Sequence, residues 1–593
     1  MKNHSVPLFI ILIASSLFSC SPKTEQYQIN GTISDPVKRS FQIDDQTIQV
    51  SEDGSFHFIK EIEGAIFLDI SYANLEWPVF LNPESSLDIQ ISGRSFDAVE
   101  YRGDLAASNT YLLGVAPITQ EINEYFNENW VQIHQQDQLA YISTIDSLKG
   151  LYLKHLTADS ETYQTFSKTF TEAWTTEINF SFNKLILYYP RNHLSLTGER
   201  VELSESSISY AKLQEIDKSE YIDLPSYKDY TEDWIDFQAD RLVMEEPSVK
   251  HYNLMKMDAV SRLVPEIFTN QYLRDYWYME YLKAFIEKNG LLNSQPYIKH
   301  FETSCSTTIF ESEIKEYLAS MEDQRADHEV KIYKTENAFK LEAHIFNPED
   351  LLTNEKRPAI VIFHGGGWNG GNASWSFEKA RHFKDLGMIA IAAQYRLCNR
   401  QDITALESMS DARDLIIWMR LNSDSLNIDP NRIVAYGWSA GAHLVSSAAI
   451  FEESIPEKAI NSVPDAMILI SPAVSLPKGR GWEGWKLNVF GATTTVSSAN
   501  PVEHVRKGLP PTIILQGRDD TVTPLEGVEA FHKEMLEHGN HCELFIYDEV
   551  GHLFTPNTMP DNGQPHPDKE IQRKAYDQAD AFLKKLDYIK EHR

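Results

Sequence analysis

The chain has 593 residues, and 54 Lys and Arg against 86 Asp and Glu give it a formal net charge of −32. A chain this acidic lacks the basic surface that binding to a nucleic-acid backbone or to anionic lipid headgroups requires. Hydrophobic residues make up 42% and charged residues 24%, so the composition is that of a globular protein and excludes wholesale disorder. The length predicts several domains, and only four cysteines exclude a disulfide-dense scaffold.

The N-terminus has the pattern of a targeting segment. After Lys2, an apolar run from Val6 to Phe18 is too short to span a bilayer and is typical of a signal peptide. The run ends in Leu-Phe-Ser-Cys20, which resembles the lipobox of bacterial lipoproteins, in which the cysteine becomes the lipidated first residue. This resemblance implies a signal peptide at 1–19, lipidation at Cys20 and an extracytoplasmic protein, periplasmic or at the cell surface, bound to a bacterial membrane by its lipid. An ordinary secretory signal cut nearby is the alternative.

Two regions of different texture follow a short tether over residues 20–26. Residues 27–95 alternate apolar and polar side chains between turn pairs such as Asn30-Gly31, which predicts a small β-sandwich. This segment resembles the small β-domain at the N-terminus of many bacterial lipoproteins. Residues 96–327 change to helical periodicity without a repeat period, so we expect a helical domain. Its dense aromatic residues indicate core packing, and a platform that stacks sugars or a partner is the alternative.

From residue 328 to 593, apolar runs alternate with amphipathic segments. Val330–Tyr333 and Lys340–Ile345 are expected to pair antiparallel, and Ala359–Phe363 has the continuous apolar pattern of a strand buried on both faces. One of the amphipathic segments, Ala405–Leu421, has the pattern of a helix that lies between two strands. The predicted fold class is therefore α/β, with a mainly parallel C-terminal sheet covered by helices and preceded by a small β-sandwich and a helical region.

The strongest chemical motif is Gly437-Trp438-Ser439-Ala440-Gly441. It lies between an apolar strand and a helical run, which is the context of a nucleophile elbow. There the serine takes a strained turn that exposes its hydroxyl, and the flanking glycines lack the Cβ atoms that would clash in so tight a turn. A second motif, His364-Gly365-Gly366-Gly367-Trp368, ends a buried strand. Its bare backbone N–H groups suit an oxyanion hole.

An acid and a histidine follow the serine, each on the loop after a predicted strand. The acid is one of the neighbours Asp519 and Asp520, and the histidine is His552. The order Ser, acid, His is that of the α/β-hydrolase fold among serine hydrolases.

These motifs together resemble the α/β-hydrolase esterases of the hormone-sensitive-lipase and carbohydrate-esterase kind. The resemblance covers about residues 328 to 593 and includes Gln394-Tyr395-Arg396-Leu397 and Asp411-Ala412-Arg413-Asp414. It implies a catalytic triad of Ser439, Asp520 and His552. Oxyanion donors would be the N–H groups of Gly366, Gly367 and Ala440. The spacing from Gly517 and to Pro524 favours Asp520 over Asp519, which stays open as the alternative.

Four tryptophans are candidates for the substrate pocket: Trp368, Trp438, Trp482 and Trp485. For the last two, an aromatic clamp on a sugar or phenolic ring competes with simple lid packing. His443, one turn after the serine, is expected to be packed beside the site. A cluster in the sequence comprises His532, His538, His541 and Cys542. His532 and His538 are six residues apart on a predicted helix and face different ways, so we expect no metal there.

The leading hypothesis is a serine ester hydrolase that works through an acyl-enzyme without a cofactor. The family and the expected location suggest a small-molecule or polysaccharide ester as substrate, with an acetyl, feruloyl or short-chain acyl group, and polysaccharide degradation as the setting. A serine peptidase of the prolyl-oligopeptidase type is one alternative. However, Ala440 stands where that group usually has Tyr or Asn. A non-catalytic polysaccharide-binding lipoprotein is the other.

Overall fold

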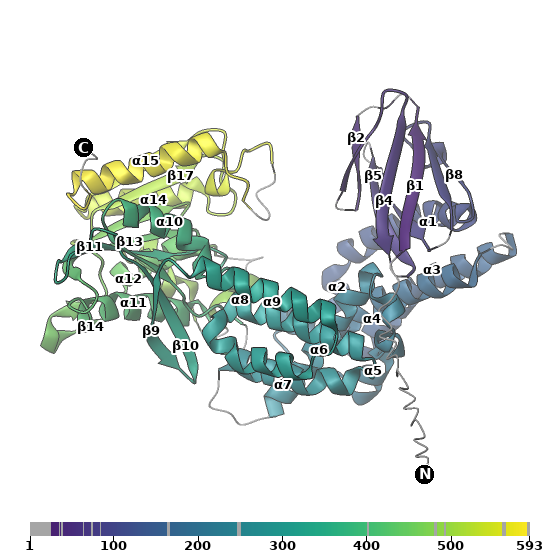
Figure 1. Cartoon of the computed structure of the whole chain (residues 1–593), viewed down its shortest axis with the longest axis horizontal. Helices are drawn as coiled ribbons and strands as arrows, with labels where there is room; N and C mark the ends of the chain where they lie inside the picture. Colours follow the sequence, from purple (N-terminus) through teal and green to yellow (C-terminus); the bar gives the residue numbers. More distant parts are fainter. Residues whose placement is uncertain are drawn as a thin grey trace, which may run out of the picture. The chain divides into compact units, whose positions relative to one another are not determined.

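The computed structural model describes residues 25–589 except for short gaps, which are residues 35, 37–38, 45, 63, 73–74, 84, 163–165, 246–250, 400–401, 479–482, 492–493 and 560–564. The predicted signal peptide and Cys20 lie outside the described residues. The chain forms two compact units (Figure 1). The first comprises residues up to Pro190 together with Val201–Trp234, and the second comprises Arg191–Arg200 together with Ile235 onward.

The first unit contains a β-sandwich of two four-stranded sheets, with strand orders β4-β1-β7-β8 and β3-β2-β5-β6. In β7 the side chains of Leu87, Ile89 and Ile91 are buried between more exposed neighbours, as the alternating pattern predicts. The strands continue to Arg102, beyond the end at residue 95 that the sequence suggests. The strands are β1 (Glu25–Ile33), β2 (Ser40–Ile43), β3 (Gln46–Gln49), β4 (Ser55–Ile62), β5 (Ile66–Tyr72), β6 (Leu75–Leu81), β7 (Leu87–Ile91) and β8 (Val99–Arg102).

Helices α1 to α6 follow the sandwich, and the boundary between the two units falls within α4 and α6. Asn109 of α1 donates to the carbonyl of Phe80 and accepts from its N–H, so it pairs with the backbone of edge strand β6. The ring of Phe80 packs 5.1 Å from that of Phe170 in α4. Sandwich and helices therefore share one aromatic core. The helices are α1 (Ala106–Glu128), α2 (Trp130–His134), α3 (Gln138–Thr162), α4 (Lys168–Thr197), α5 (Glu205–Ala211) and α6 (Pro225–Glu245).

The second unit is built on an eight-stranded sheet of order β18-β17-β16-β13-β11-β12-β10-β9. Only the pairs β9–β10 and β10–β12 are antiparallel, so the sheet is mainly parallel, as expected. A separate short pair, β14 (Ser454–Ile455) and β15 (Ile460–Asn461), lies outside it. The strands of the large sheet are β9 (Glu329–Glu336), β10 (Phe339–Phe346), β11 (Arg357–Phe363), β12 (Ile389–Ala393), β13 (Ile428–Trp438), β16 (Ala466–Ile470), β17 (Thr512–Gly517) and β18 (Cys542–Tyr547).

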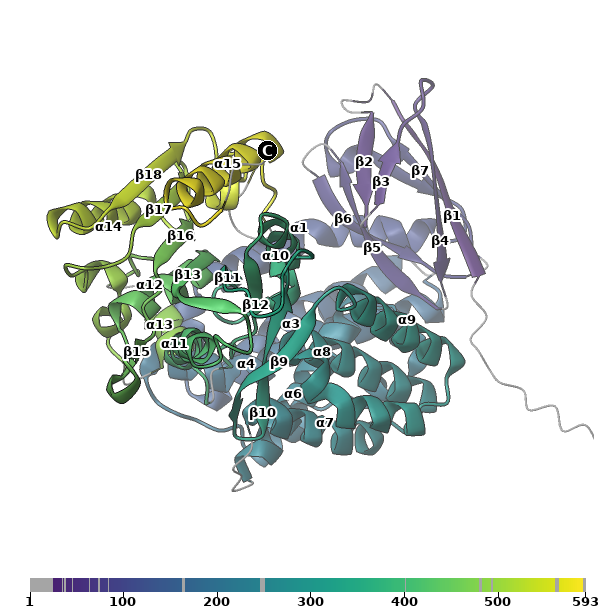
Figure 2. The same cartoon turned by 60° about the vertical axis from the view of Figure 1, so that its left-hand side comes forward.

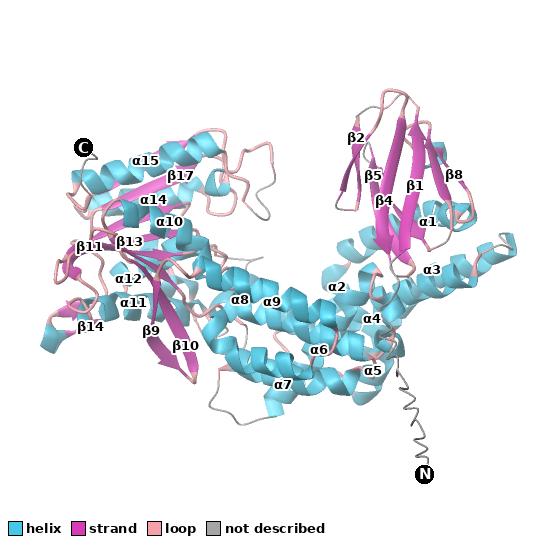
Figure 3. Ribbon diagram, in the orientation of Figure 1, coloured by secondary structure: helices cyan, strands magenta, loops and turns pink. Residues whose placement is uncertain are grey.

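Helices cover both faces of this sheet (Figure 3). Buried residues of α11, α12 and α14 share one hydrophobic cluster with the sheet, and those of α10 and α15 share another. The predicted helix Ala405–Leu421 forms with those bounds, because Thr404 and Glu407 close a capping box at its start. The helices are α10 (Phe377–Asp385), α11 (Ala405–Leu421), α12 (Ala440–Ile450), α13 (Glu483–Phe490), α14 (Leu525–Glu537) and α15 (Lys569–Lys585).

Three further helices belong to this second unit: α7 (Tyr252–Ile267), α8 (Gln271–Ser304) and α9 (Thr308–Gln324). Figure 2 shows α8 and α9 beside β9 and β10, and Arg325, just after α9, pairs with the buried carboxylate of Glu342 in β10. The unit thus begins well before residue 328, where the sequence places the boundary of the catalytic domain. Within the described residues, no helix combines the length and the apolar character that a membrane span requires.

Candidate active site

Ser439 lies at the sharp turn between β13 and α12. Its φ is 52° and its ψ is −122°, a strained conformation for a residue with a side chain. The turn packs tightly, since a Cβ atom on Gly441 would lie 2.1 Å from the carbonyl oxygen of Phe363 at the end of β11. Because Phe363 is paired with Gly437 in the sheet, the loop after β11 and the turn at Ser439 leave the same edge side by side.

The structure brings His552 between Ser439 and Asp520. His552 Nε2 is 3.0 Å from Ser439 Oγ, and His552 Nδ1 is 2.9 Å from Asp520 Oδ2. In this arrangement Nδ1 donates to the carboxylate, and Nε2 is left to accept the hydrogen of the serine hydroxyl. Three loops that are distant in the sequence therefore place their functional groups in one line.

Asp520 is almost fully buried at 4% exposure, and its carboxylate is well supplied with donors. Oδ1 accepts from the N–H groups of Val522 and Thr523, and Oδ2 accepts from the hydroxyl of Thr523. Burial alone would raise the pKa of Asp520. The hydrogen bond and the charge interaction with His552, together with the two hydrogen bonds from Thr523, outweigh this effect. They hold this pKa below its usual range. The carboxylate is thus kept ionised beside the imidazole.

The neighbouring carboxylate of Asp519 points elsewhere. Its Oδ2 accepts a hydrogen bond of 2.8 Å from Asn557, and its side chain is exposed to solvent. The geometry therefore places Asp520, and not Asp519, in contact with His552.

The Gly-rich loop over residues 364–368 presents free backbone donors next to the serine. Gly366 has a φ of 114°, and a Cβ atom there would lie 2.2 Å from the carbonyl oxygen of Gly370. Within the part of the chain that the structure describes, the N–H groups of Gly366, Gly367 and Ala440 donate to no protein acceptor. Ala440 is the first residue of α12, where a helix leaves its N–H groups unpaired.

Both ends of this loop carry buried aromatic side chains in fixed contacts. Burial lowers the pKa of His364 to about 4, so this imidazole is neutral, and its Nδ1 lies 2.7 Å from the carbonyl of Gly365. At the other end Trp368 donates from Nε1 to Nδ1 of His443, whose Nε2 bonds to the carbonyl of Ala499. His443 is fully buried with a pKa of about 4, so it is a packed neutral residue.

The three described tryptophan candidates divide between two hydrophobic clusters. Trp368 and Trp485 lie with ring centroids 6.1 Å apart in one hydrophobic cluster. Trp438 belongs to the cluster on the other face of the sheet, where the ammonium of Lys379 lies 4.8 Å from its ring centre. Trp482 lies outside the described residues. Trp438 thus packs in a different hydrophobic cluster from Trp368 and Trp485, although a Cβ atom on Gly365 of the Gly-rich loop would lie 2.7 Å from its ring.

Two polar residues at the site were not singled out from the sequence. Besides bonding to Asp520, the hydroxyl of Thr523 lies 3.3 Å from His552 Nδ1. Buried Ser471, directly after β16, accepts from the N–H of Leu553, which has a φ of 51°. Ser471 thereby stabilises the strained backbone beside His552. A polar residue at the carboxyl end of a buried strand was the available signal for Ser471, and position three after the acid was the signal for Thr523.

The remaining histidine, cysteine and acidic side chains of the described residues form no candidate metal site. Among the described residues, no three His, Cys, Asp or Glu side chains are grouped so that they could hold a metal ion. Burial raises the pKa of the Cys398 and Cys542 thiols to about 12, so neither is a thiolate near neutral pH.

The comparisons with known proteins concern this C-terminal region. Residues 344–466 match the family described as BD-FAE. A non-reducing polyketide synthase, prhL, of Penicillium brasilianum is 24% identical in an alignment of 336 residues that covers 40% of this chain and 13% of that protein. The "Probable carboxylic ester hydrolase LipM" of Mycobacterium tuberculosis is 25% identical in an alignment of 220 residues that covers 32% of this chain and 48% of that protein. The chain thus spans less than half the length of these curated relatives.

Among solved structures, the apo form of Thermogutta terrifontis esterase 2 is 31% identical, with a TM-score of 0.40. The match covers 45% of this chain and 97% of that one. The family match and the LipM relative support an esterase-like α/β-hydrolase for the C-terminal region.

Proposed function

We propose that this protein is a serine ester hydrolase that acts through an acyl-enzyme, with Ser439 as nucleophile and His552 as general base. The observation that carries the proposal is the position of the His552 imidazole, 3.0 Å from Ser439 Oγ and 2.9 Å from Asp520 Oδ2. A serine hydroxyl is a weak nucleophile until an adjacent base removes its proton, and this geometry supplies that base.

The reaction proceeds in two steps. Ser439 Oγ attacks the ester carbonyl carbon while its proton moves to His552 Nε2, and Asp520 stabilises the resulting imidazolium. The imidazolium then protonates the departing alcohol, which leaves Ser439 acylated. Water attacks the acyl carbon, gives a proton to the same nitrogen and releases the acid, and that proton returns to Ser439 Oγ. Acid, alcohol and free enzyme balance the ester and the water.

The oxyanion of each tetrahedral intermediate would bind at the unpaired N–H groups of Gly366, Gly367 and Ala440. Donors that are fixed before the substrate arrives need no reorganisation in the transition state, and removing one donor costs about 10² to 10³ in kcat. The tight packing of Gly366 against Gly370 and of Gly441 against Phe363 supports such a fixed arrangement.

For the substrate we propose an ester carried by a carbohydrate, with an acetyl or feruloyl acyl group. The support is the resemblance to carbohydrate esterases and the expected position outside the cytoplasm.

The test is a panel of p-nitrophenyl acyl esters, acetylated xylan and feruloylated oligosaccharides, assayed with a protein of residues 21–593 and with the Ser439→Ala variant of that protein. Ester turnover that the variant lacks would support the proposal. Turnover of peptides alone would favour the peptidase alternative, and no turnover with retained polysaccharide binding would favour the scaffold.

We also propose that the chain is attached to a bacterial membrane through lipid on Cys20. The support is the lipobox-like end of the apolar N-terminal run. Cys20→Ala should move the protein from the membrane fraction to the soluble extracytoplasmic fraction and abolish incorporation of labelled fatty acid. Unchanged fractionation would leave a simple secreted enzyme.

A further inference from the structure

A short segment after β12 contacts both ends of the Gly-rich loop. This segment, residues 394–399, is called the clasp loop below. The hydroxyl of Tyr395 donates to the carbonyl of His364 over 2.9 Å, and the N–H of Cys398 donates to the carbonyl of Trp368 over 2.8 Å. The ring of Tyr395 also stacks on that of His364, with centroids 4.4 Å apart. Any shift of the clasp loop is therefore transmitted to the loop that carries Gly366 and Gly367.

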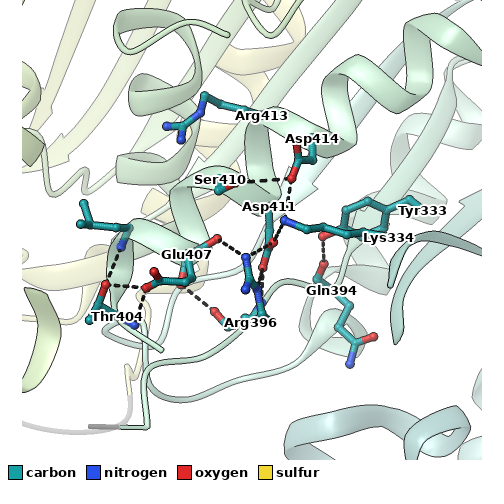
Figure 4. A network of polar contacts seen from close by, with 12 residues as sticks. Tyr333, Lys334, Gln394, Arg396, Thr404, Glu407, Ser410, Asp411, Arg413 and Asp414 are labelled. Carbon is teal, nitrogen blue, oxygen red and sulfur yellow. Dashed lines mark hydrogen bonds and ion pairs between the residues drawn. The ribbon is translucent and has the colours of Figure 1, made fainter. Parts of the chain in front are cut away.

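Helix α11 fixes the clasp loop from one side through a buried ion pair (Figure 4). Arg396 donates to both carboxylate oxygens of Asp411 over 2.8 Å, and the backbone N–H of Arg396 donates to the same group. Lys334 of β9 reaches Asp411 and Asp414 as well. Burial would lower the pKa of Arg396, but Asp411 outweighs it and raises the pKa, so the pair stays charged.

Helices α7 and α8 contact the clasp loop from another direction. The amide of Asn399 donates to the side-chain oxygen of Asn253 in α7 over 3.2 Å. Asn253 in turn donates to Asn289 in α8 over 2.9 Å. The chain of contacts from α8 to α7 to the clasp loop is thus formed by three amide side chains, each of which uses its acceptor and its donor in a defined direction.

A break in α8 brings its backbone close to the first residue of the clasp loop. Gly290 has φ 78° and ψ 162° inside this otherwise continuous helix. A Cβ atom there would lie 3.2 Å from Nε2 of Gln394 and 3.1 Å from Glu342 Oε2. Gln394 is itself paired with β10, since it exchanges hydrogen bonds with the backbone of Glu342. The helices therefore meet both the start and the end of the clasp loop.

We propose that α7 and α8 act on the proposed ester hydrolysis by holding the clasp loop, and through it the Gly-rich loop, in the geometry that binds the oxyanion. Asn253 is then a positioning residue that never touches the substrate. The proposal rests on the proposed function, and it assigns to helices α7 and α8 a role that their sequence does not suggest.

The expected effect follows from the steep dependence of oxyanion stabilisation on geometry. A misplacement of about 1 Å caused far from the chemistry can cost on the order of 10² in rate. Loss of one side-chain contact to the clasp loop should produce a smaller shift, so we expect Asn253→Ala to lower kcat about tenfold. KM should stay within about twofold, because the contact is felt in the transition state more than in substrate binding.

Two further variants separate positioning from general stability. Asn253→Asp keeps the acceptor for Asn399 and loses the donor to Asn289, so it should lower kcat less than Asn253→Ala does. Asn293→Ala is the matched control, because Asn293 is a buried amide of α8 that bonds to the backbones of Asn289 and of Lys340 in β10 and makes no bond to the clasp loop. It should lower the melting temperature without lowering kcat.

The experiment uses residues 21–593 and measures kcat and KM on p-nitrophenyl acetate, inhibition by phenylboronic acid and hydrogen exchange of peptides from the Gly-rich loop. The proposal expects Asn253→Ala to weaken boronate binding in step with kcat and to speed exchange in 364–371, and Asn293→Ala to do neither.

The double variant Asn253→Ala with Asn399→Ala should lower kcat by less than the product of the two single effects. Wild-type kcat and exchange in Asn253→Ala, or equal losses in Asn293→Ala, would overturn it. If wild-type turnover does not depend on Ser439, the proposed function fails, and the exchange measurement still decides whether the helices hold the loop.

Discussion

Each of the two units buries a carboxyl group, and the pKa values of these two groups are shifted in opposite directions. In the first unit Glu177 of α4 accepts hydrogen bonds from the N–H and the hydroxyl of Ser226, and no cation faces it among the groups that set its pKa. Burial dominates and raises the pKa of Glu177 to about 7. In the second unit Asp520 is buried as well, but His552 and Thr523 hold its pKa below the usual range.

The difference shows what makes a buried acid fit for catalysis. Desolvation disfavours the charged form of any buried carboxyl group, and only enough donors with a partly positive neighbour reverse that effect. Glu177 is a packing residue that is about half protonated at pH 7, whereas Asp520 is ionised and can orient an imidazole. The carboxyl ends of parallel strands supply such donors from several loops at once, and an aromatic core does not.

The largest losses of kcat are expected from substitutions of the three hydrogen-bonded residues Ser439, His552 and Asp520. Ser439→Ala, His552→Ala and Asp520→Asn should each lower kcat by about 10³ or more, because each removes part of one proton-transfer unit. Steady-state assays on a p-nitrophenyl ester measure this, and the double variants should be little worse than the single ones. Asp519→Asn is the control and should cost roughly tenfold or less. The reverse ranking of the two Asp variants would contradict the assignment of the acid.

The extent of the catalytic unit comes next. A fragment of residues 328–593 contains every triad and oxyanion candidate, but it lacks α7 to α9 and exposes the buried carboxylate of Glu342 that pairs with Arg325. We expect it to be at least about tenfold less active than residues 235–593, which are the continuous part of the second compact unit. Circular dichroism checks that both are folded. Equal activity would mean that these helices are dispensable for the site.

Thr523 tests how much the donors around Asp520 matter. Thr523→Val keeps the shape of the side chain and removes the hydroxyl that bonds to Asp520 Oδ2. We expect a loss of about tenfold in kcat, the equivalent of one charge-assisted hydrogen bond of about 1.5 kcal/mol. Thr521→Val, at an exposed neighbouring position, is the matched control and should be close to wild type. A silent Thr523→Val would show that the backbone donors suffice.

The smallest effect is expected in the first unit and concerns stability alone. The pKa of Glu177 is about 7 in the folded chain and near 4.5 in the unfolded one, so unfolding releases a proton between these values. The stability of this unit should therefore fall as the pH rises from about 4.5 to about 7, by on the order of 2 kcal/mol. Glu177→Gln should flatten this dependence in thermal melts and leave esterase activity unchanged. The control is Glu172→Gln, an exposed residue of the same helix paired with Lys168. A wild-type melt that does not vary over this range would contradict the protonated state of Glu177.

The sequence alone determined the α/β class and the candidate site residues of the C-terminal region. Strands with continuous apolar runs, such as Ala359–Phe363, can only be buried on both faces, and Gly-x-Ser-x-Gly between a strand and a helix permits few backbone paths. Spacing within one loop was enough to favour Asp520 over Asp519, since adjacent side chains on a turn point in different directions. Such patterns depend only on residues close together in the chain, so they can be recognised in the sequence alone.

Only the tertiary structure decided which distant groups outside the catalytic motifs meet. No spacing relates Asn253 to Asn399, or Ser471 to Leu553, because their contacts depend on how helices and loops pack after the sheet has formed. The same holds for the placement of Trp438 and Trp368 in different hydrophobic clusters, since the face that each side chain meets depends on how the strand end and the loop pack. The division into two compact units is also not visible in the sequence. Helical periodicity is the same on both sides of residue 235, whereas the division between the units is set by which helices share a core.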